Sequence, residues 1–135
     1  MNKEVFLGGT CNDSQWREQL IPLLKCDYFN PVVKDWNEEA QKEEIEKRET
    51  CDYVLYVITP KMTGVYTIAE VVDDSYKRPE KTLFCIITND DNNEFTEHQL
   101  KSLKMVKNLV RANLARTFET LEDVAGFLNF VTAQQ

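Results

Sequence analysis

The chain has 135 residues, a length that suits one domain, expected to span residues 1–135 with a single core. Its formal net charge of −7 argues against binding along a nucleic-acid polymer, because that affinity comes mainly from Lys and Arg side chains that neutralise phosphates. No apolar stretch reaches about eighteen residues, and no basic start precedes an apolar segment. We therefore expect a cytoplasmic protein without a membrane span or a signal peptide.

The cysteines and the histidine do not form a recognisable metal site. No cysteine pair has CxxC spacing, and His98 is the only histidine. We therefore expect reduced thiols and no metal, with Cys11 able to face a cleft and the other cysteines in or beside the core. The other cysteines are Cys26, Cys51 and Cys85. The chain also lacks a GxGxxG motif and a Walker loop, and no cofactor is expected.

The first predicted unit is a strand over residues 4–7 followed by a helix. The strand runs into a Gly-Gly-Thr segment, where the missing side chains let a ligand approach the backbone. Three polar residues can each cap the helix, whose apolar residues recur at helical spacing. The segment is Gly8, Gly9 and Thr10, and the candidate caps are Asn12, Asp13 and Ser14. We interpret Trp16, on the apolar stripe, as a core residue in preference to a ligand platform.

A short strand over residues 27–30 is ended by Pro31, which cannot donate to a sheet. The following loop contains Asp35 and Trp36. A tryptophan there can stack on a planar base while the acid binds a sugar hydroxyl, but an ordinary anchor of the loop fits equally well. Residues 37–50 then predict a charged, solvated helix with few apolar contacts.

The most informative stretch runs from residue 51 to residue 70. Residues 53–58 are continuously apolar, which predicts a central parallel strand covered on both faces. Ligands of such sheets collect where strands end, and this region leads to Glu70. Thr67 and Glu70 also have the spacing of a capping box, and spacing alone favours that structural role. The two roles are compatible, because the field at a helix start favours an ionised carboxylate.

The rest of the chain repeats the alternation of strands and helices. It predicts a strand over residues 82–88, a polar loop over 89–94, and a helix opened by a capping box of Thr96 and Gln99. A brief strand near residues 115–118 and a helix from Thr120 follow. Five such βα units indicate an α/β three-layer sandwich with a five-stranded parallel sheet in the flavodoxin-like order 2-1-3-4-5.

Several short segments together resemble the nucleoside 2-deoxyribosyltransferase-like family, most closely its divergent branch. In that branch an FLxGT start, an NPxxxDW segment and a TxxE segment recur in this order. This chain carries them as Val5-Phe-Leu-Gly-Gly-Thr10, Asn30-Pro31 with Asp35-Trp36, and Thr67-Ile-Ala-Glu70, with a glutamate-rich helix leading to Cys51-Asp52. The resemblance covers about residues 4 to 88.

The resemblance implies chemistry at an N-glycosidic bond by double displacement, as in retaining glycosidases. The family nucleophile falls on Glu70, and an assisting acid or sugar-binding group falls on Glu44. The substrate is expected to be a small nucleoside or nucleotide. Its crevice is expected to be lined by Gly8, Gly9, Thr10, Asn30, Trp36, Gly64 and Thr67. Family precedent also favours a homo-oligomer.

The chain departs from the better-studied branch at three positions. Val72 stands where that branch has a glycine two residues after the nucleophile. Phe6 stands where that branch has a tyrosine that orients the nucleophile, and Gly64 stands where it has an aspartate. Asp35 is expected to take over the role of that aspartate. Base transfer is the first choice of reaction and hydrolysis the second. A module that binds a nucleotide-derived signal without turnover is the alternative from a different functional class.

Overall fold

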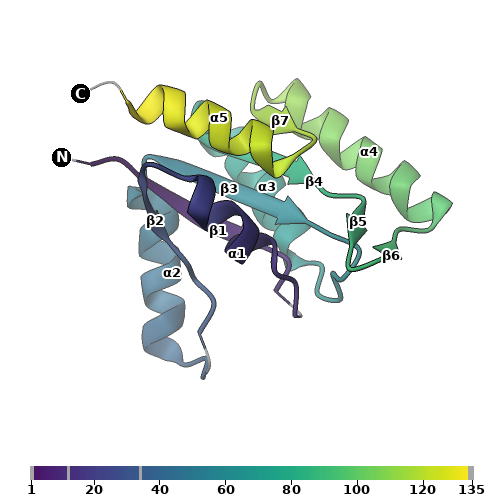
Figure 1. Ribbon diagram of the computed structural model, residues 1–135, viewed down its shortest axis with the longest axis horizontal. Coiled ribbons are helices and arrows are strands. Elements are labelled where there is room, and N and C mark those ends of the chain that lie inside the picture. Colours follow the sequence, from purple (N-terminus) through teal and green to yellow (C-terminus); the bar gives the residue numbers. More distant parts are fainter. Residues whose placement is uncertain (1, 12, 34, 134–135) are drawn as a thin grey trace.

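The computed structural model describes residues 2–11, 13–33 and 35–133, and its centre is a five-stranded parallel sheet (Figure 1). The strand order is β2-β1-β3-β4-β7, and every neighbouring pair is parallel. The strands are β1 (Glu4–Gly9), β2 (Asp27–Phe29), β3 (Tyr53–Ile58), β4 (Thr82–Ile86) and β7 (Arg116–Phe118). Because β7 is the fifth strand of this sheet, the order is 2-1-3-4-5, which confirms the predicted flavodoxin-like arrangement.

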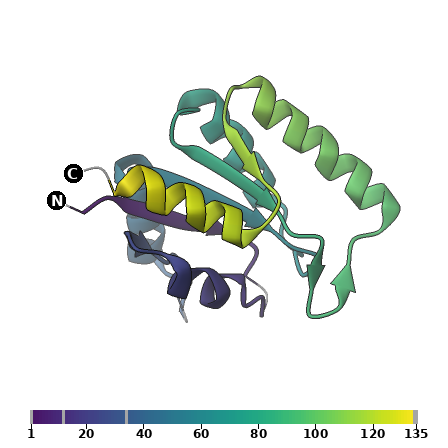
Figure 2. The same cartoon turned by 45° about the horizontal axis from the view of Figure 1, so that its top comes forward.

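Helices cover both faces of the sheet (Figure 2). They are α1 (Trp16–Leu20), continued by the short 3-10 turn η1 (Ile21–Leu23), α2 (Glu38–Thr50), α3 (Tyr66–Lys77), α4 (Glu97–Ala112) and α5 (Leu121–Thr132). One core cluster joins α1 and α5 to one face, and a second joins α3 and α4 to the other. Among the described residues, no helix has the length and apolar character needed to cross a membrane.

The central strand β3 is buried as its apolar run predicts. From Val54 to Ile58 each residue has no exposed surface, and successive side chains point to opposite faces. Leu55 packs with α1 and α5, whereas Tyr56 packs with α3 and α4. Trp16 is 2% exposed within the first cluster, which confirms its interpretation as a core residue.

The predicted caps differ in outcome. At the start of α4, the backbone N–H of Gln99 donates to Thr96 Oγ1 and the Gln99 side chain accepts from the Thr96 N–H, which confirms this capping box. The prediction that Asp13 or Ser14 caps α1 is wrong, because Gln15 occupies the cap position without a side-chain bond. Ser14 Oγ instead donates to Asp90 Oδ2 over 2.6 Å. The third candidate, Asn12, lies outside the described residues.

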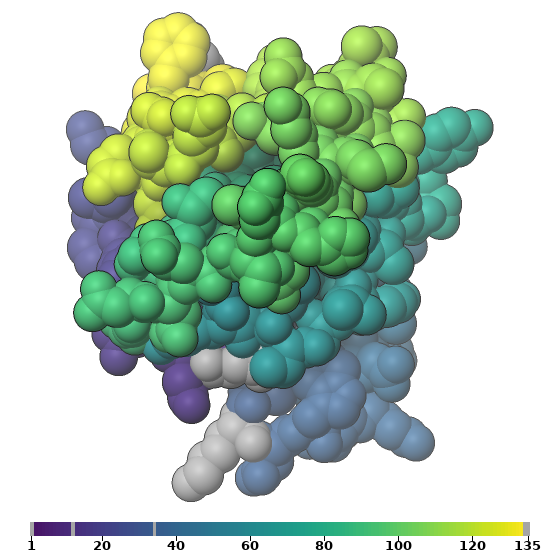
Figure 3. All heavy atoms as spheres, turned by 90° about the vertical axis from the view of Figure 1, so that its right-hand side faces the viewer, coloured from purple at the N-terminus to yellow at the C-terminus, as the bar shows by residue number. Residues whose placement is uncertain are grey.

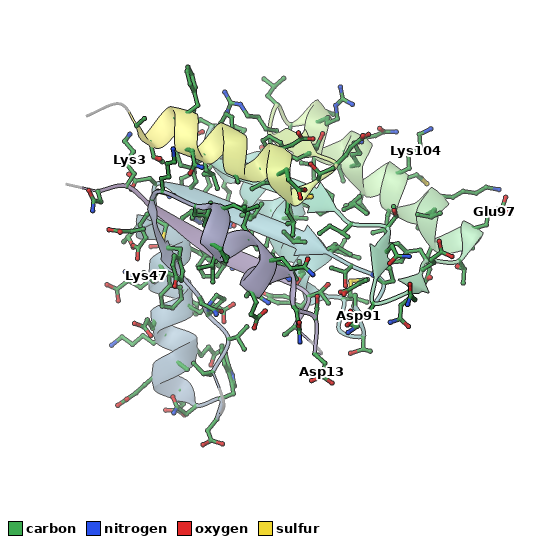
Figure 4. All side chains as sticks on the ribbon, viewed as in Figure 1. Lys3, Asp13, Lys47, Asp91, Glu97 and Lys104 are labelled. Carbon is green, nitrogen blue, oxygen red and sulfur yellow. The ribbon has the colours of Figure 1, made fainter. Side chains whose placement is uncertain are left out.

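The segment 89–94 is more ordered than the predicted polar loop. Asn89–Asp90 (β5) and Asn93–Glu94 (β6) form an antiparallel hairpin, and the two residues between them have φ values of 52° and 64°. Positive φ at both turn positions is the feature of a type I′ turn. Lys61 Nζ donates to Asp91 and to the Asp13 carbonyl, so the hairpin is tied to the end of the sheet where β1 and β3 finish. Figure 4 shows Asp13 and Asp91 at this same end.

Candidate active site

A cleft of about 290 Å³ lies at the carboxyl end of β1, in the region expected for ligands of an open α/β sheet. Its walls come from β1, α1, the loop after β2, α2 and α3. In Figures 1 and 3, α2 projects from the rest of the molecule, so that one wall of the cleft is a helix that stands apart. The lining residues are Phe6, Gly8, Gly9, Cys11, Arg17, Pro31, Val32, Val33, Trp36, Glu44, Thr67 and Glu70.

The two glycines of the cleft are required by the packing of the sheet. A Cβ atom on Gly9 would lie 2.0 Å from the Val57 carbonyl oxygen, and Gly9 has a φ of 127°, a conformation that favours glycine. A Cβ atom on Gly8 would lie 2.8 Å from the Tyr56 ring. The glycines therefore let β1 continue beside β3 as far as Gly9, past the predicted end at residue 7.

Thr10 holds the end of β1 against β3. Its N–H donates to the Val57 carbonyl over 2.9 Å, and its hydroxyl oxygen accepts from the Thr59 N–H over 3.1 Å. Its side chain is almost completely buried. These contacts give Thr10 a structural role, and it does not line the cleft that contains Glu70.

Arg17 is a cleft residue that the sequence reasoning missed. The residue is 4% exposed, and its guanidinium donates to the carbonyls of Leu7, Thr10 and Gly9 at 3.0, 2.8 and 3.3 Å. It also lies over the Trp16 ring, 4.4 Å from the centroid. Burial lowers the pKa of Arg17 to about 10. A cation one position after Trp16, within a short helix that packs on the sheet, is the only sequence signal that marks it.

Glu70 lies one turn inside α3, and its residue is 9% exposed. The predicted capping box of Thr67 and Glu70 is wrong, because Val65 is the N-cap residue and no side chain caps this helix. Burial raises the pKa of Glu70 to about 7, with Arg48 acting in the opposite direction and Glu44 and Asp74 adding to the increase. Across the described residues, neither carboxylate oxygen of Glu70 accepts a hydrogen bond.

The helix α2 contributes Glu44 and Arg48 to the surroundings of Glu70. The two residues are four positions apart, which places them on one face of the helix. Arg48 Nη1 lies 3.4 Å from Glu70 Oε2. Burial raises the pKa of Glu44, while Arg48 and Arg17 act to lower it. The cleft is therefore lined by two carboxylates whose burial favours the protonated form and by the Arg17 guanidinium, while Arg48 lies beside Glu70 outside the lining.

Behind Glu70, a completely buried aspartate organises the charges. Asp74 Oδ1 lies 3.0 Å from Arg48 Nη2 and 3.4 Å from Arg78 Nε, and Asp74 Oδ2 accepts from the Tyr56 hydroxyl. Burial raises the pKa of Tyr56, and Asp74 adds to that increase. This network connects α2, α3 and β3 directly below the candidate site.

The other predicted site residues divide into two groups. Trp36, which is 55% exposed, and Thr67 line the same cleft as Glu70 and Glu44. Asn30 is exposed, and its side-chain oxygen accepts from the Val32 N–H over 3.0 Å, an arrangement that forms a local turn. Asp35 lies in a different hollow beside Asn37, and Gly64 is exposed with open space around it. None of these three residues lines the cleft that contains Glu70.

The structure places the four cysteines in the cleft and in or beside the core. Cys11 lines the cleft, as its position after the glycines suggests. Cys51 and Cys85 are at most 1% exposed, and Cys26 packs against the first core cluster. Across the described ranges, no three His, Cys, Asp or Glu side chains are grouped in a way that suits a metal ion.

A larger hollow of about 450 Å³ lies between β4, β7 and α4. It combines an apolar floor that includes Phe84 and Phe118 with Lys104 and Lys107. Its carboxylate, Glu119, has a side chain that is 83% exposed and lies 3.7 Å from Lys107. This hollow contains no pair of buried carboxylates, so it does not offer the acid and nucleophile that the smaller cleft does.

Comparisons with known proteins assign a family to the first two thirds of the chain. A family model described as nucleoside 2-deoxyribosyltransferase like matches residues 2–90. This range contains β1 to β4 and all twelve residues that line the cleft. A search of curated proteins found no match. Because the family model covers more than half of the sequence, the chain belongs to the nucleoside 2-deoxyribosyltransferase-like family.

Proposed function

We propose that the protein transfers a nucleobase between deoxynucleosides or nucleotides, with Glu70 as the nucleophile. The observation that carries this proposal is the setting of Glu70: a buried residue, 9% exposed, that lines a cleft, has one ion pair with Arg48 but no hydrogen bond from a described residue, and has a raised pKa. A carboxylate that serves only to stabilise a fold is normally hydrogen-bonded or ion-paired on several sides. Membership of the family supports the same class of substrate.

The proposed reaction has two displacement steps. A Glu70 carboxylate oxygen attacks the anomeric carbon, an ester bond to the sugar forms, and the bond between the sugar and the base breaks with its electron pair leaving on the base. A second base then attacks the same carbon, which releases Glu70 and gives the new nucleoside. Attack by water in place of the second base gives free sugar.

Glu44 is the second acidic group of the proposal. It lines the same cleft, and burial raises its pKa. At a given pH, Glu44 is therefore protonated in a larger fraction of the molecules than an exposed glutamate is. A protonated carboxyl group can donate to the departing base or bind a sugar hydroxyl. Trp36 offers an exposed aromatic face at the rim of the cleft, where a planar base can stack.

The proposal is tested by incubating the protein with a deoxynucleoside and a second free base, and by separating the products. We expect a new nucleoside that contains the second base. Free sugar as the sole product would replace transfer by hydrolysis. If a broad panel gives neither product while the deoxynucleoside still raises the melting temperature, the cleft binds nucleosides without turnover, and the proposed reaction is wrong.

Replacing Glu44 separates its role from that of the surrounding charge. We expect Glu44→Gln to lower kcat by about a hundredfold, because the amide cannot donate a proton to the leaving base. The matched control is Glu43→Gln, an exposed neighbour on α2 that does not line the cleft, and it should keep the parent rate. Equal rates for the parent and both variants, measured in the transfer assay, would remove Glu44 from the mechanism.

A further inference from the structure

We propose that Arg48 is a positioning residue that orients the Glu70 carboxylate and holds α2, with Glu44, against the cleft. The inference rests on the proposed role of Glu70. It starts from the observation that one guanidinium contacts three carboxylates of α3 at once, the longest contact being 3.9 Å between Arg48 Nη2 and Asp73 Oδ2. Arg48 Nη2 lies 3.0 Å from Asp74 Oδ1, and Arg48 Nη1 lies 3.4 Å from Glu70 Oε2.

Asp74 fixes the position of the Arg48 guanidinium. Its Nε also donates to Asp74 Oδ2 over 3.4 Å, so the guanidinium faces Asp74 with two donors, the arrangement that most restricts an arginine. Asp74 has no exposed surface and is itself held by the Tyr56 hydroxyl and by Arg78. Arg78 Nη1 then donates to the Arg48 carbonyl over 3.1 Å, which ties α2 to the end of α3.

The contact with Glu70 is an ion pair without a hydrogen bond. The shortest distance between the two side chains joins Arg48 Nη1 and Glu70 Oε2, at 3.4 Å. Among the described residues, no donor forms a hydrogen bond with either Glu70 oxygen. An ion pair of this kind orients a nucleophile while its lone pairs stay available for attack.

Arg48 also supplies the positive charge that counteracts the effect of burial on the pKa of Glu70. The titratable groups that face Glu70 are Arg48 and Glu44 from α2, Tyr56 from β3, and Asp74 on its own helix. Of these four, Arg48 alone favours the ionised carboxylate. Burial lowers the pKa of Arg48, but Tyr56, Asp74 and Glu70 together raise it above its ordinary value, so Arg48 stays charged throughout the range in which Glu70 titrates.

The helix α2 itself depends on such ionic contacts. None of its residues is buried, so little apolar packing attaches it to the sheet. Lys47 contacts Glu4 at 3.0 Å, and Arg48 contacts Asp74 and Glu70 (Figure 4 labels Lys47). Lys47 is therefore a matched control: it is a neighbouring cation that anchors the same helix but makes no contact with Glu70.

The test follows the titration of the Glu70 side chain by carbon NMR, which requires no turnover. We compare the parent protein with Arg48→Gln, Arg48→Lys and Lys47→Gln. We expect Arg48→Gln to raise the pKa of Glu70 by at least about one unit, because the opposing cation is gone. Lys47→Gln should leave this pKa unchanged. Arg48→Lys, which keeps the charge but loses the two-donor contact, should keep the pKa near that of the parent and lower kcat about tenfold.

The outcomes separate this inference from the proposed reaction. A raised Glu70 pKa in Arg48→Gln supports the positioning role of Arg48 even if no variant transfers a base. The lack of transfer would then contradict only the proposed reaction. If Arg48→Gln does not fold, the Arg48→Lys variant provides the test. A kcat of Arg48→Lys equal to that of an active parent protein would overturn the inference. An unchanged Glu70 pKa in a folded Arg48→Gln, with a loss of stability similar to that in Lys47→Gln, would make Arg48 only a structural tether.

Discussion

Glu70→Gln is expected to lower the rate of base transfer by at least about a thousandfold, because glutamine keeps the shape of the side chain but cannot form the sugar ester. The measurement is kcat in the transfer assay. Asp73→Asn is the matched control, since Asp73 lies on the same helix, does not line the cleft, and has a side chain that is 46% exposed and only a long contact of 3.9 Å with Arg48. The control should retain nearly the full rate. A Glu70→Gln variant as active as the control would exclude Glu70 as the nucleophile.

The same variant should leave the fold intact and should stabilise it at high pH. The pKa of Glu70 is about 7 in the folded protein, above the ordinary value of 4.5, so the parent loses stability as the pH rises from about 4.5 to about 7. A neutral glutamine does not undergo this loss. We expect Glu70→Gln to be more stable than the parent by ~1–3 kcal/mol above this range and equal to it below, as measured by urea unfolding. If Glu70→Gln is less stable than the parent by the same amount above and below this pH range, Glu70 has a structural role.

Asp74→Ala is expected to have the largest effect on stability, a loss of about 3–5 kcal/mol. The substitution leaves Arg48 and Arg78 without their buried counter-ion and the Tyr56 hydroxyl without its acceptor. Asp74 has no exposed surface, so water cannot replace these contacts without a rearrangement.

Chemical unfolding of Asp74→Ala beside Asp73→Ala measures this effect. Asp73 is partly exposed and its replacement should change stability by at most about 0.5 kcal/mol. Similar values for the two variants would show that the buried network contributes little to the fold. Because Arg48 depends on Asp74, any folded Asp74→Ala protein should also have a lower transfer rate.

The sheet could be predicted from the sequence because its signals are local. The continuous apolar run of residues 53–58 needs no distant contact to be recognised as a covered strand, and the alternation of elements fixes the order of strands. The cap at Thr96 was equally visible. The predicted cap at Thr67 failed because α3 already begins at Tyr66, so Thr67 lies inside the helix, where its side chain is not in the cap position.

The site was less accessible to sequence reasoning. Asp35 and Trp36 are adjacent in the loop, yet Trp36 lines the cleft and Asp35 lies in another hollow, a difference that depends on the path of the loop. Arg17, Arg48 and Asp74 act through contacts between elements that no spacing rule reports. Arg48 and Asp74, for example, are 26 positions apart, and their pairing depends on how α2 and α3 pack.

The most direct test of the account is mass spectrometry of the protein after incubation with a 2-fluoro-substituted nucleoside, which slows the release of a covalent sugar intermediate. We predict a sugar adduct on the peptide that contains Glu70, absent from the Glu70→Gln variant. An adduct on a different carboxylate, in a protein that transfers the base, would contradict the assignment of Glu70 as the nucleophile.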